Sequence, residues 1–465
     1  MTLSRRKLLI AGGVAGATLS ARSWTSLVRG EVPSNRIRVG VIGTGVRGKY
    51  LIGNLPDSAR IEAICDCATS RMGETLKPKA EFKDVLADFA SKQARHCSTH
   101  HDYRQMIDQT KLDAVIIATP DHHHVQAAML ALEAGLDVYL EKPLSLTIRE
   151  GRLLSDAVRK TGRILQVGSQ QRSMEANRFA CEFIRDGGLG KITRVDVPNY
   201  PGPMSIPDFP KQPVPGGLHW DLFLGAARKR PHHRQLWIKD DFKVGDLLWR
   251  GWDLFRDYSG HLMTNWGGHN LDMVQYALGM DESGPVKVEP LRDVSEAALL
   301  QDWKKKWHKK TPKPDGAFSD DSRFAPIRMT YPGGIEMNFL PDVPTATFYG
   351  ERGRMTIARN KFKCDPANLI DDAPTASESE RWDGSGHVAR PHLQNWLDCI
   401  RSRSTPNAPV EVGHRSATVC HLANIARDLN RPLVWHPDSE QFDDADANEL
   451  LDRPRREGFR LPHVS

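Results

Sequence analysis

The chain has 465 residues, of which 39% are hydrophobic and 26% charged, and its formal net charge is +6 at pH 7. This composition is typical of a soluble globular protein, and past residue 30 no apolar run is long enough to cross a bilayer. Five basic and no acidic residues lie within residues 1–30, so the rest of the chain carries only +1 and gives no reason to expect nucleic-acid binding.

The N-terminus reads as an export leader. Ser4–Leu9 (Ser-Arg-Arg-Lys-Leu-Leu) matches a twin-arginine signal, and the apolar run Leu8–Leu19 that follows it is too short for an ordinary membrane-spanning helix. Ser20 and Ala21 offer small residues for cleavage without a clear A-x-A site, so cleaved and membrane-tethered forms both remain open. We assign residues 1–33 to this leader and expect export by the twin-arginine machinery, to the periplasm or to a membrane surface.

A strand and a glycine-rich turn come next. Ile37–Ile42 predicts a short buried strand, and Gly43, Gly45 and Gly48 follow at G-x-G-x-x-G spacing. The first glycine permits a tight turn, the second lets the backbone approach a pyrophosphate, and the third lets the next helix pack closely. The motif alone also fits an ordinary strand-to-helix turn, so its context decides between the two.

That context is a second strand, Ile61–Cys65, which ends at Asp66, 18 residues beyond Gly48. An acidic side chain there accepts hydrogen bonds from an adenosine ribose and repels a 2′-phosphate, so NAD is favoured over NADP. Arg71 lies close enough in sequence to keep NADP open. Because twin-arginine export moves folded proteins to places without a soluble NADH pool, we expect the nucleotide to be returned to its starting state within the protein's own cycle.

Strands and helices alternate through residues 36–168, as in a doubly wound parallel sheet, and we assign this range to an NAD-binding Rossmann domain. The predicted strands are Leu112–Thr119, Asp137–Leu140 and Ile164–Val167, and the predicted helices are Val125–Gly135 and Ile148–Lys160.

Residues 169–437 lose the regular alternation of strands and helices, and we assign them to a second domain. Residues 438–465 form a polar tail that we expect to lie over the surface. Two Pro/Gly/aromatic stretches, Pro198–Gly217 and His219–Gly260, either cap a core or line a sugar-sized cleft. Asp293–Asp321 is charged and reads as a solvated helix or insertion. We also expect helices at Ala176–Asp186, His392–Ser402 and Arg415–Leu429, a half-exposed strand at Ile192–Val197, and a hairpin of Ile327–Tyr331 with Ile335–Phe339.

No metal site is expected. The seven cysteines are scattered without C-x-x-C or Cys/His spacing, and export after folding means that disulfides are not required. His122, His123 and His124 are adjacent, and consecutive residues rarely converge on one ion.

From Arg36 to Pro437 the chain resembles the glucose–fructose oxidoreductase / inositol dehydrogenase / rhizopine catabolism (Gfo/Idh/MocA) family. The resemblance implies an α/β fold: an N-terminal Rossmann domain and a C-terminal α/β domain whose open, mostly antiparallel sheet forms the substrate cleft and often an oligomer interface. A homo-oligomer, a dimer or tetramer, is therefore expected. The motifs that carry the resemblance are the glycine turn, Thr119–His124, Glu141-Lys142-Pro143, Asn265–Asp272 and Arg431–Trp435.

By this resemblance, Lys142 lies beside the nicotinamide and the reacting hydroxyl, and the bond before Pro143 is cis, which fixes the turn that aims the lysine. His124 matches the histidine that follows the Thr-Pro turn beside the cofactor. The expected cofactor-binding residues are Gly43, Gly45, Val46, Arg47, Gly48, Asp66, Thr119, Pro120, His124, Glu141 and Lys142.

One motif departs from the family. Members usually show Asp-x-Gly-x-His, whereas this chain has Asn265 at the aspartate position and keeps His269. Asparagine can hold a sugar hydroxyl but cannot accept a proton, so His269 is expected to be the base, with Lys142 lowering the pKa of the hydroxyl. The alternative is that His269 is an ordinary buried histidine near a helix start.

Three functions follow from these residues. The first is an exported NAD-dependent oxidoreductase acting on a sugar or polyol, with Lys142, His269 and Asn265 at the reacting alcohol and a second substrate returning the hydride. The second is an NAD-dependent glycosidase that oxidises, eliminates, hydrates and reduces with no net redox change. The third is a sugar-binding protein whose catalytic site has decayed, for which Asn265 is the only indication.

Overall fold

The computed structural model describes residues 35–79, 82–237, 251–291, 321–370 and 389–462. The predicted leader lies outside these ranges, as do Trp249 and nearly all of the charged segment Asp293–Asp321. Among the described helices, none combines the length and the apolar character that crossing a membrane requires.

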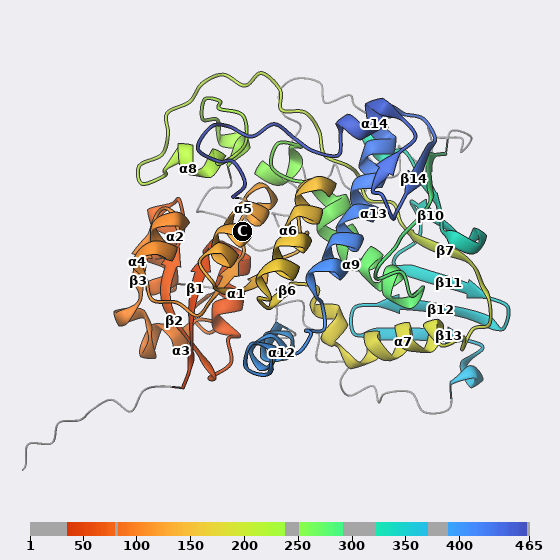
Figure 1. Cartoon of the computed structure of the whole chain (residues 1–465), viewed down its shortest axis with the longest axis horizontal. Coiled ribbons are helices and arrows are strands. Elements are labelled where there is room, and N and C mark those ends of the chain that lie inside the picture. Colours follow the sequence, from red (N-terminus) through yellow and green to blue (C-terminus); the bar gives the residue numbers. More distant parts are fainter. Residues whose placement is uncertain (1–34, 80–81, 238–250, 292–320, 371–388, 463–465) are drawn as a thin grey trace, which may run out of the picture. The chain divides into compact units, whose positions relative to one another are not determined.

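Residues 37–167 contain a six-stranded parallel sheet in the order β3-β2-β1-β4-β5-β6, drawn in red to yellow in Figure 1. Its central strands β1, β4 and β5 are buried almost throughout, as a parallel sheet covered on both faces requires. The predicted doubly wound sheet is therefore confirmed. The strands are β1 (Ile37–Ile42), β2 (Ala59–Cys65), β3 (Ser98–His100), β4 (Ala114–Ile117), β5 (Asp137–Leu140) and β6 (Leu165–Val167).

Helices follow these strands and cover the sheet. The helix α5 (His124–Glu133) and the helix α6 (Ile148–Thr161) match the predicted ones to within two residues. The remaining helices here are α1 (Val46–Gly53), α2 (Thr69–Leu76), α3 (Ala87–Lys92) and α4 (Tyr103–Gln109).

The second sheet has nine strands in the order β13-β12-β11-β7-β10-β9-β8-β14-β15. The described pairs are antiparallel except β7 with β10, so the expected mostly antiparallel sheet is confirmed. Its strands are β7 (Ile192–Pro198), β8 (Lys287–Pro290), β9 (Ile327–Thr330), β10 (Glu336–Leu340), β11 (Ala346–Gly350), β12 (Gly353–Ala358), β13 (Lys361–Asp365), β14 (Leu433–His436) and β15 (Gln441–Phe442).

Three long helices, α7 (Glu175–Arg185), α9 (His261–Ala277) and α13 (Val410–Leu429), contribute to the apolar core on this sheet (Figure 1). The strand β7 departs from the half-exposed alternation expected of it, because residues 195–198 are all buried. Its place in the middle of the sheet, between β11 and β10, accounts for the difference.

The helix α12 (Ala389–Ser402), which we had assigned to the second domain, packs instead on the N-terminal sheet. Trp396 is fully buried, and its ring meets Tyr139 of β5 edge-on at 5.7 Å between centroids. This return of the chain helps to make residues 36–465 a single unit.

The aromatic stretch after β7 caps a core of its own. Trp220 of the helix α8 (Trp220–Leu224) stacks on Phe223 at 4.9 Å, and Phe223 meets Trp237 edge-on at the same distance. These rings belong to a buried cluster that also contains Tyr258. Of the two roles considered for these aromatics, capping a core is therefore what the described ones do.

The C-terminal tail does not simply drape over the surface. Phe442, Ala447 and Leu451 are buried in the core of the second sheet, where the short helix α14 (Ala445–Glu449) packs. Farther on, Arg453 and Arg455 reach the buried Glu150 of α6 at 2.9 and 3.0 Å. The expectation erred because the polar composition of this segment hides three apolar anchors.

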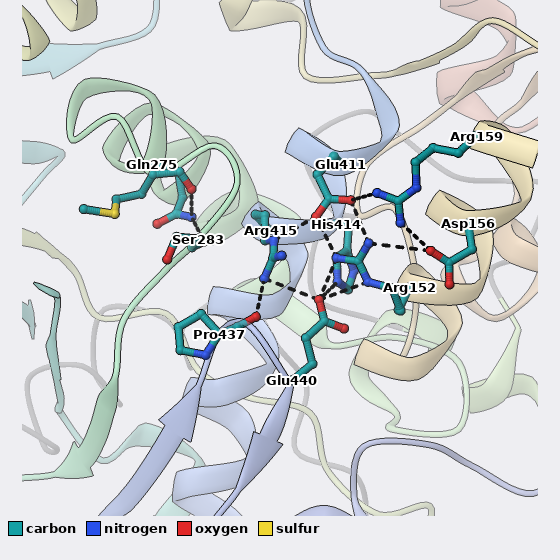
Figure 2. Close-up of polar contacts among 11 residues, drawn as sticks. Arg152, Asp156, Arg159, Gln275, Ser283, Glu411, His414, Arg415, Pro437 and Glu440 are labelled. Carbon is teal, nitrogen blue, oxygen red and sulfur yellow. Dashed lines mark hydrogen bonds and ion pairs between the residues drawn. The ribbon is translucent and has the colours of Figure 1, made fainter. Parts of the chain in front are cut away.

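An ion-pair network ties this tail to α6 and α13 (Figure 2). Its centre is Oε1 of Glu440, which lies 2.7 Å from Nε2 of His414, 2.7 Å from Nη2 of Arg152 and 3.3 Å from Nη1 of Arg415. Burial disfavours the charged carboxylate, but the hydrogen bonds from His414 and Arg152 outweigh it and lower the pKa of Glu440 to about 2.

We therefore expect Glu440→Gln to lower the free energy of unfolding at neutral pH by about 2 kcal/mol, because the buried cations lose their shared charge. The contribution of a carboxylate with a lowered pKa is complete above its ordinary value of 4.5 and is lost as the pH falls toward 2. Urea unfolding at several pH values measures both effects. Glu449→Gln, at an exposed position, is the control, and an equal loss in the two variants would contradict the prediction.

Candidate functional site

The turn between β1 and α1 has no room for a side chain at two of its three motif glycines. Gly43 has φ +91°, and a Cβ there would lie 2.5 Å from the carbonyl oxygen of Ala118. A Cβ on Gly48 would lie 2.0 Å from the carbonyl oxygen of Gly43. Gly45, in contrast, faces open space, with only the end of the Arg71 side chain 4.0 Å away. The backbone is thus approachable at the position where the motif places a pyrophosphate.

Asp66 lies at the end of β2 with its carboxylate turned toward this turn. Oδ2 accepts hydrogen bonds from the Thr44 amide at 2.8 Å and the Thr44 hydroxyl at 3.1 Å, and Oδ1 accepts from the Ala68 amide at 3.0 Å. The side chain therefore holds the turn in shape, a role that the sequence did not reveal. Its contact with a ribose stays a prediction.

Arg47 and Glu141, both expected to bind the cofactor, bind each other. Nε of Arg47 donates to Oε1 of Glu141 at 2.6 Å, which joins the start of α1 to the residue after β5. The Glu141 side chain also fills the space that a Cβ on Gly168 would need. Val46, the first residue of α1, is half-buried beside them.

Two further turns meet at His124. Its Nδ1 lies 2.7 Å from the carbonyl oxygen of Pro143, and its Nε2 lies 3.0 Å from that of Thr119. Burial lowers the pKa of this histidine. Pro120 immediately precedes the 3-10 segment Asp121–His123. The hydroxyl oxygen of Thr119, the residue before Pro120, is buried without a hydrogen-bond partner among the described residues. His124 thus fixes the Thr-Pro turn against the Lys-Pro turn.

Lys142 follows β5, and the peptide bond between it and Pro143 is cis, as expected. Its Nζ donates to Oδ1 of Asn265 at 2.8 Å and to the carbonyl oxygen of Asn265 at 3.2 Å. Burial lowers the pKa of this lysine, while the nearby carboxylates of Glu141 and Asp121 act in the opposite direction. Two residues 123 positions apart are thereby brought together.

His269 lies one helical turn after Asn265 on α9, so the two side chains share a face. Burial holds the pKa of His269 well below its ordinary value, and the positive charges of Arg359 and Lys142 lower it further. No described residue forms a hydrogen bond with its ring. A neutral imidazole with a free ring nitrogen beside a lysine can accept a proton from a bound alcohol.

Arg359 is a neighbour that sequence reasoning missed. It follows β12, and its guanidinium lies 4.4 Å from the ring centroid of Trp266 on α9. No motif marks it, because the turn that carries it comes from the second sheet and lies far from Lys142 in sequence.

A buried acidic network behind Asn265 was also missed. The hydroxyl oxygen of Ser259 lies 2.9 Å from Oδ2 of Asp121 and 3.3 Å from Oδ1 of Asp253. Oδ2 of Asp253 lies 3.2 Å from Nδ1 of His261, which begins α9 with φ +56°. The sequence held a weak signal, since Asp121 stands inside the Thr119–His124 motif.

The described residues contain no cluster of three or more His, Cys, Asp or Glu side chains arranged to hold a metal ion. Nε2 of His122 and Nε2 of His123 both lie against the carbonyl oxygen of Phe223, at 2.8 and 2.9 Å. All seven cysteines have free thiols.

The N-terminal site fits a dinucleotide. The glycine-rich turn leaves open space at Gly45, and the first helical turn of α1 carries no acidic residue that would repel a phosphate. The buried hydroxyl of Thr119 has no hydrogen-bond partner among the described residues. We expect Lys142 and His269 to lie at the far end of such a ligand. His269 belongs to α9, and Lys142 forms a hydrogen bond with Asn265 on the same helix.

Two family models match the chain. "Oxidoreductase family, NAD-binding Rossmann fold" matches residues 37–169, and "Oxidoreductase family, C-terminal alpha/beta domain" matches residues 204–313 and 385–461. Both descriptions agree with the two sheets seen here.

Curated relatives match parts of the chain. A levoglucosan dehydrogenase of Pseudarthrobacter phenanthrenivorans is 34% identical over 113 residues, which is 24% of this chain and 29% of that protein. The NAD(+)-dependent scyllo-inositol 2-dehydrogenase of Bacillus subtilis is 31% identical over 158 residues, covering 34% of this chain and 42% of its own. A glycosyl hydrolase family 109 protein of Solibacter usitatus is 32% identical over 158 residues, 32% of this chain and 34% of that one. Each match thus spans less than half of the relative.

Solved structures share the fold over most of the chain. The aldose-aldose oxidoreductase of Caulobacter crescentus aligns with a TM-score of 0.53 at 17% identity, over 86% of this chain and 99% of that one. The WlbA dehydrogenase of Bordetella pertussis, solved with NADH and UDP-GlcNAcA, aligns with a TM-score of 0.53 at 18% identity, over 86% and 99%.

Proposed function

Because this chain belongs to the Gfo/Idh/MocA oxidoreductase family, we propose that it is an NAD-dependent oxidoreductase acting on a hydroxyl group of a sugar or polyol. The observation that carries the proposal is the hydrogen bond between Lys142 and Asn265, one helical turn from the neutral His269. A cation, an amide and a proton acceptor then surround one place, which is what the oxidation of an alcohol needs.

Each residue has a distinct task in this reaction. When bound, NAD supplies the acceptor for the hydride that leaves the carbinol carbon. His269 takes the hydroxyl proton as that hydride leaves, so the alcohol becomes a carbonyl. The Lys142 ammonium donates to the oxygen on which negative charge develops, and Asn265 holds the lysine in place.

We further propose that the protein works outside the cytoplasm, in the periplasm or tethered to the membrane, after export through the twin-arginine machinery. Its sequence supports this through the Arg5-Arg6 leader. A nucleotide carried along in the folded protein then has to be reduced and reoxidised without leaving, and the carbonyl group of a second sugar accepts the hydride and is reduced to an alcohol. A homodimer or homotetramer is the assembly that we expect.

A redox-neutral glycosidase is the second candidate, and the similarity to glycosyl hydrolase family 109 proteins favours it. The same Lys142 and His269 would assist the oxidation of a ring hydroxyl by bound NAD before elimination of the glycosidic substituent. A non-catalytic sugar-binding protein has less support, because the chain has both Lys142 and His269 and so retains the cation and the proton acceptor that the reaction needs.

The first experiment is to purify the exported protein without added cofactor, denature it and identify the released nucleotide. We expect NAD(H) at close to one per chain. Incubation with a panel of sugars, polyols and aryl glycosides then separates the candidates: reduction of the bound nucleotide by a sugar supports the oxidoreductase, and release of the aglycone without an added acceptor supports the glycosidase. Bound NAD that no sugar or glycoside alters would support the binding protein.

A further inference from the structure

Two buried acids lie near Asn265: Asp253 accepts a hydrogen bond from its Nδ2, and Asp121 is linked to Asp253 through Ser259. Asp121 follows β4, and Asp253 lies in the short 3-10 segment Gly251–Leu254; their exposed fractions are 6% and 4%. No lysine or arginine among the described residues forms a salt bridge with either. Two carboxylates held out of water this close together are strongly disfavoured if both are charged.

The hydrogen bonds of Ser259 show how the two acids coexist. Its hydroxyl oxygen lies within hydrogen-bond distance of both carboxyl groups and also accepts the backbone N–H of His261 at 3.0 Å. A serine hydroxyl has a single proton to donate, so it serves one acid and must accept from the other. All three groups are satisfied when one of the two acids is protonated and the pair carries one negative charge.

The other neighbours of the pair agree with this count. Burial and then the charge of Asp253 raise the pKa of Asp121 to about 7, so Asp121 is protonated in a substantial fraction of molecules at neutral pH. The charged and titratable groups that face the pair are Lys142 after β5 and His261 on α9, with Arg323 beyond His261. Burial lowers the pKa of His261, and its neutral ring lies against Asp253.

Asn265 connects this charge to Lys142. Its Nδ2 donates to Oδ1 of Asp253 at 3.4 Å, and its Oδ1 accepts from Nζ of Lys142 at 2.8 Å. An ammonium only donates and a carboxylate only accepts, so the amide is fixed in this orientation. A carboxylate at position 265 would lie directly against Asp253, which explains why an amide stands there.

We propose that Asp253, sharing one proton with Asp121 through Ser259, is a positioning residue that supplies from behind Asn265 the negative charge that the family places at position 265. Compared with the family pattern, the acid lies one hydrogen bond farther from the reacting alcohol. Asn265, which binds both Asp253 and Lys142, transmits the effect of the negative charge to the lysine. This inference rests on the proposed function only for the role of Lys142; the shared proton and the charge are properties of the protein alone.

The shared proton is tested by infrared difference spectroscopy of the purified protein across neutral pH. We expect a protonated-carboxyl band at neutral pH that is present in wild type, disappears in Asp121→Asn and persists in Asp257→Asn. Asp257 lies near the pair in sequence but binds Arg230 at 2.7 Å, so it is the matched control. Absence of the band from the wild type, or its persistence in Asp121→Asn, would overturn the shared proton.

The transmitted charge is tested by exchanging the acid and the amide. Asp253→Asn and Asn265→Asp are each expected to lower kcat/KM by about 10²-fold, and the double variant to recover most of the loss, because it restores one acid and one amide. A double variant that folds but is no better than the worse single variant would overturn the role of Asp253, as would a wild-type rate in Asp253→Asn.

A second readout needs no substrate. The pKa of Lys142, followed by NMR of ¹³C-labelled lysine, is expected to fall in Asp253→Asn, to rise in Asn265→Asp and to return in the double variant. If Asp253→Asn does not fold, the response of Lys142 in Asn265→Asp and the infrared band decide. If no sugar is oxidised while both spectroscopic results hold, the proposed function fails and the shared charge stands.

Discussion

Lys142→Met is expected to lower kcat/KM for sugar oxidation by about 10³-fold while the fold and the nucleotide content stay unchanged. Methionine keeps the apolar stem that lies in the buried site but removes the ammonium, which is the group that stabilises negative charge on the reacting oxygen. Among the described residues, Nζ of Lys142 forms hydrogen bonds with Asn265 alone, so we expect the loss to fall on the chemistry and not on a structural network.

Three measurements on the variant check this: steady-state rates, the amount of nucleotide released on denaturation, and the midpoint of thermal unfolding. Lys111→Met removes an exposed lysine in the same half of the chain and is expected to behave as wild type. If Lys142→Met kept more than a tenth of the wild-type rate, Lys142 would not be a catalytic residue and the non-catalytic alternative would gain support.

His269→Asn is the second large effect, with an expected fall in kcat/KM of about 10³-fold, because asparagine can hold an alcohol but cannot take its proton. The pH dependence adds a sharper criterion. Burial and the charges of Arg359 and Lys142 hold the pKa of His269 well below 6.5, so its neutral form persists into acid.

The acid limb of log kcat/KM against pH is therefore expected to lie well below pH 6.5 in the wild type and to be absent from His269→Asn. His436→Asn, which alters a half-exposed histidine paired with Asp443, should retain the limb. If the acid limb of the pH profile survived in His269→Asn, another group would be the one that accepts the hydroxyl proton. An acid limb near pH 6.5 in the wild type would mean that water reaches His269 more than its burial indicates.

The features that the sequence predicted correctly are those that depend on residues close together in the chain. The strand, glycine turn and helix at residues 37–53 depend on neighbours within a few positions, and a parallel strand covered on both faces reads as an unbroken apolar run. Lys142 was located because it stands beside a proline at a strand end. Asn265 and His269 were singled out through the family motif, and the structure places them one turn apart on α9.

What the sequence did not reveal are pairings across long separations. Arg47 with Glu141, and Asp121 with Ser259, lie 94 and 138 positions apart, and nothing near either member in the sequence indicates its partner. The packing of α12 on the first sheet and the burial of Phe442 were missed for the same reason, since a segment's composition does not say which distant surface it will cover.

The sequence by itself therefore indicated the parallel sheet and the dinucleotide turn through patterns a few residues long, and its resemblance to a family implied the second sheet and nominated Lys142, Asn265 and His269 for the reacting alcohol. Tertiary structure decided how those residues are charged. Asn265 hydrogen-bonds to Asp253, which is the basis of the role we propose for that acid, and burial, followed by the charge of Arg359 after β12, lowers the pKa of His269. Burial and through-space charge set protonation, and both exist only after the chain has folded.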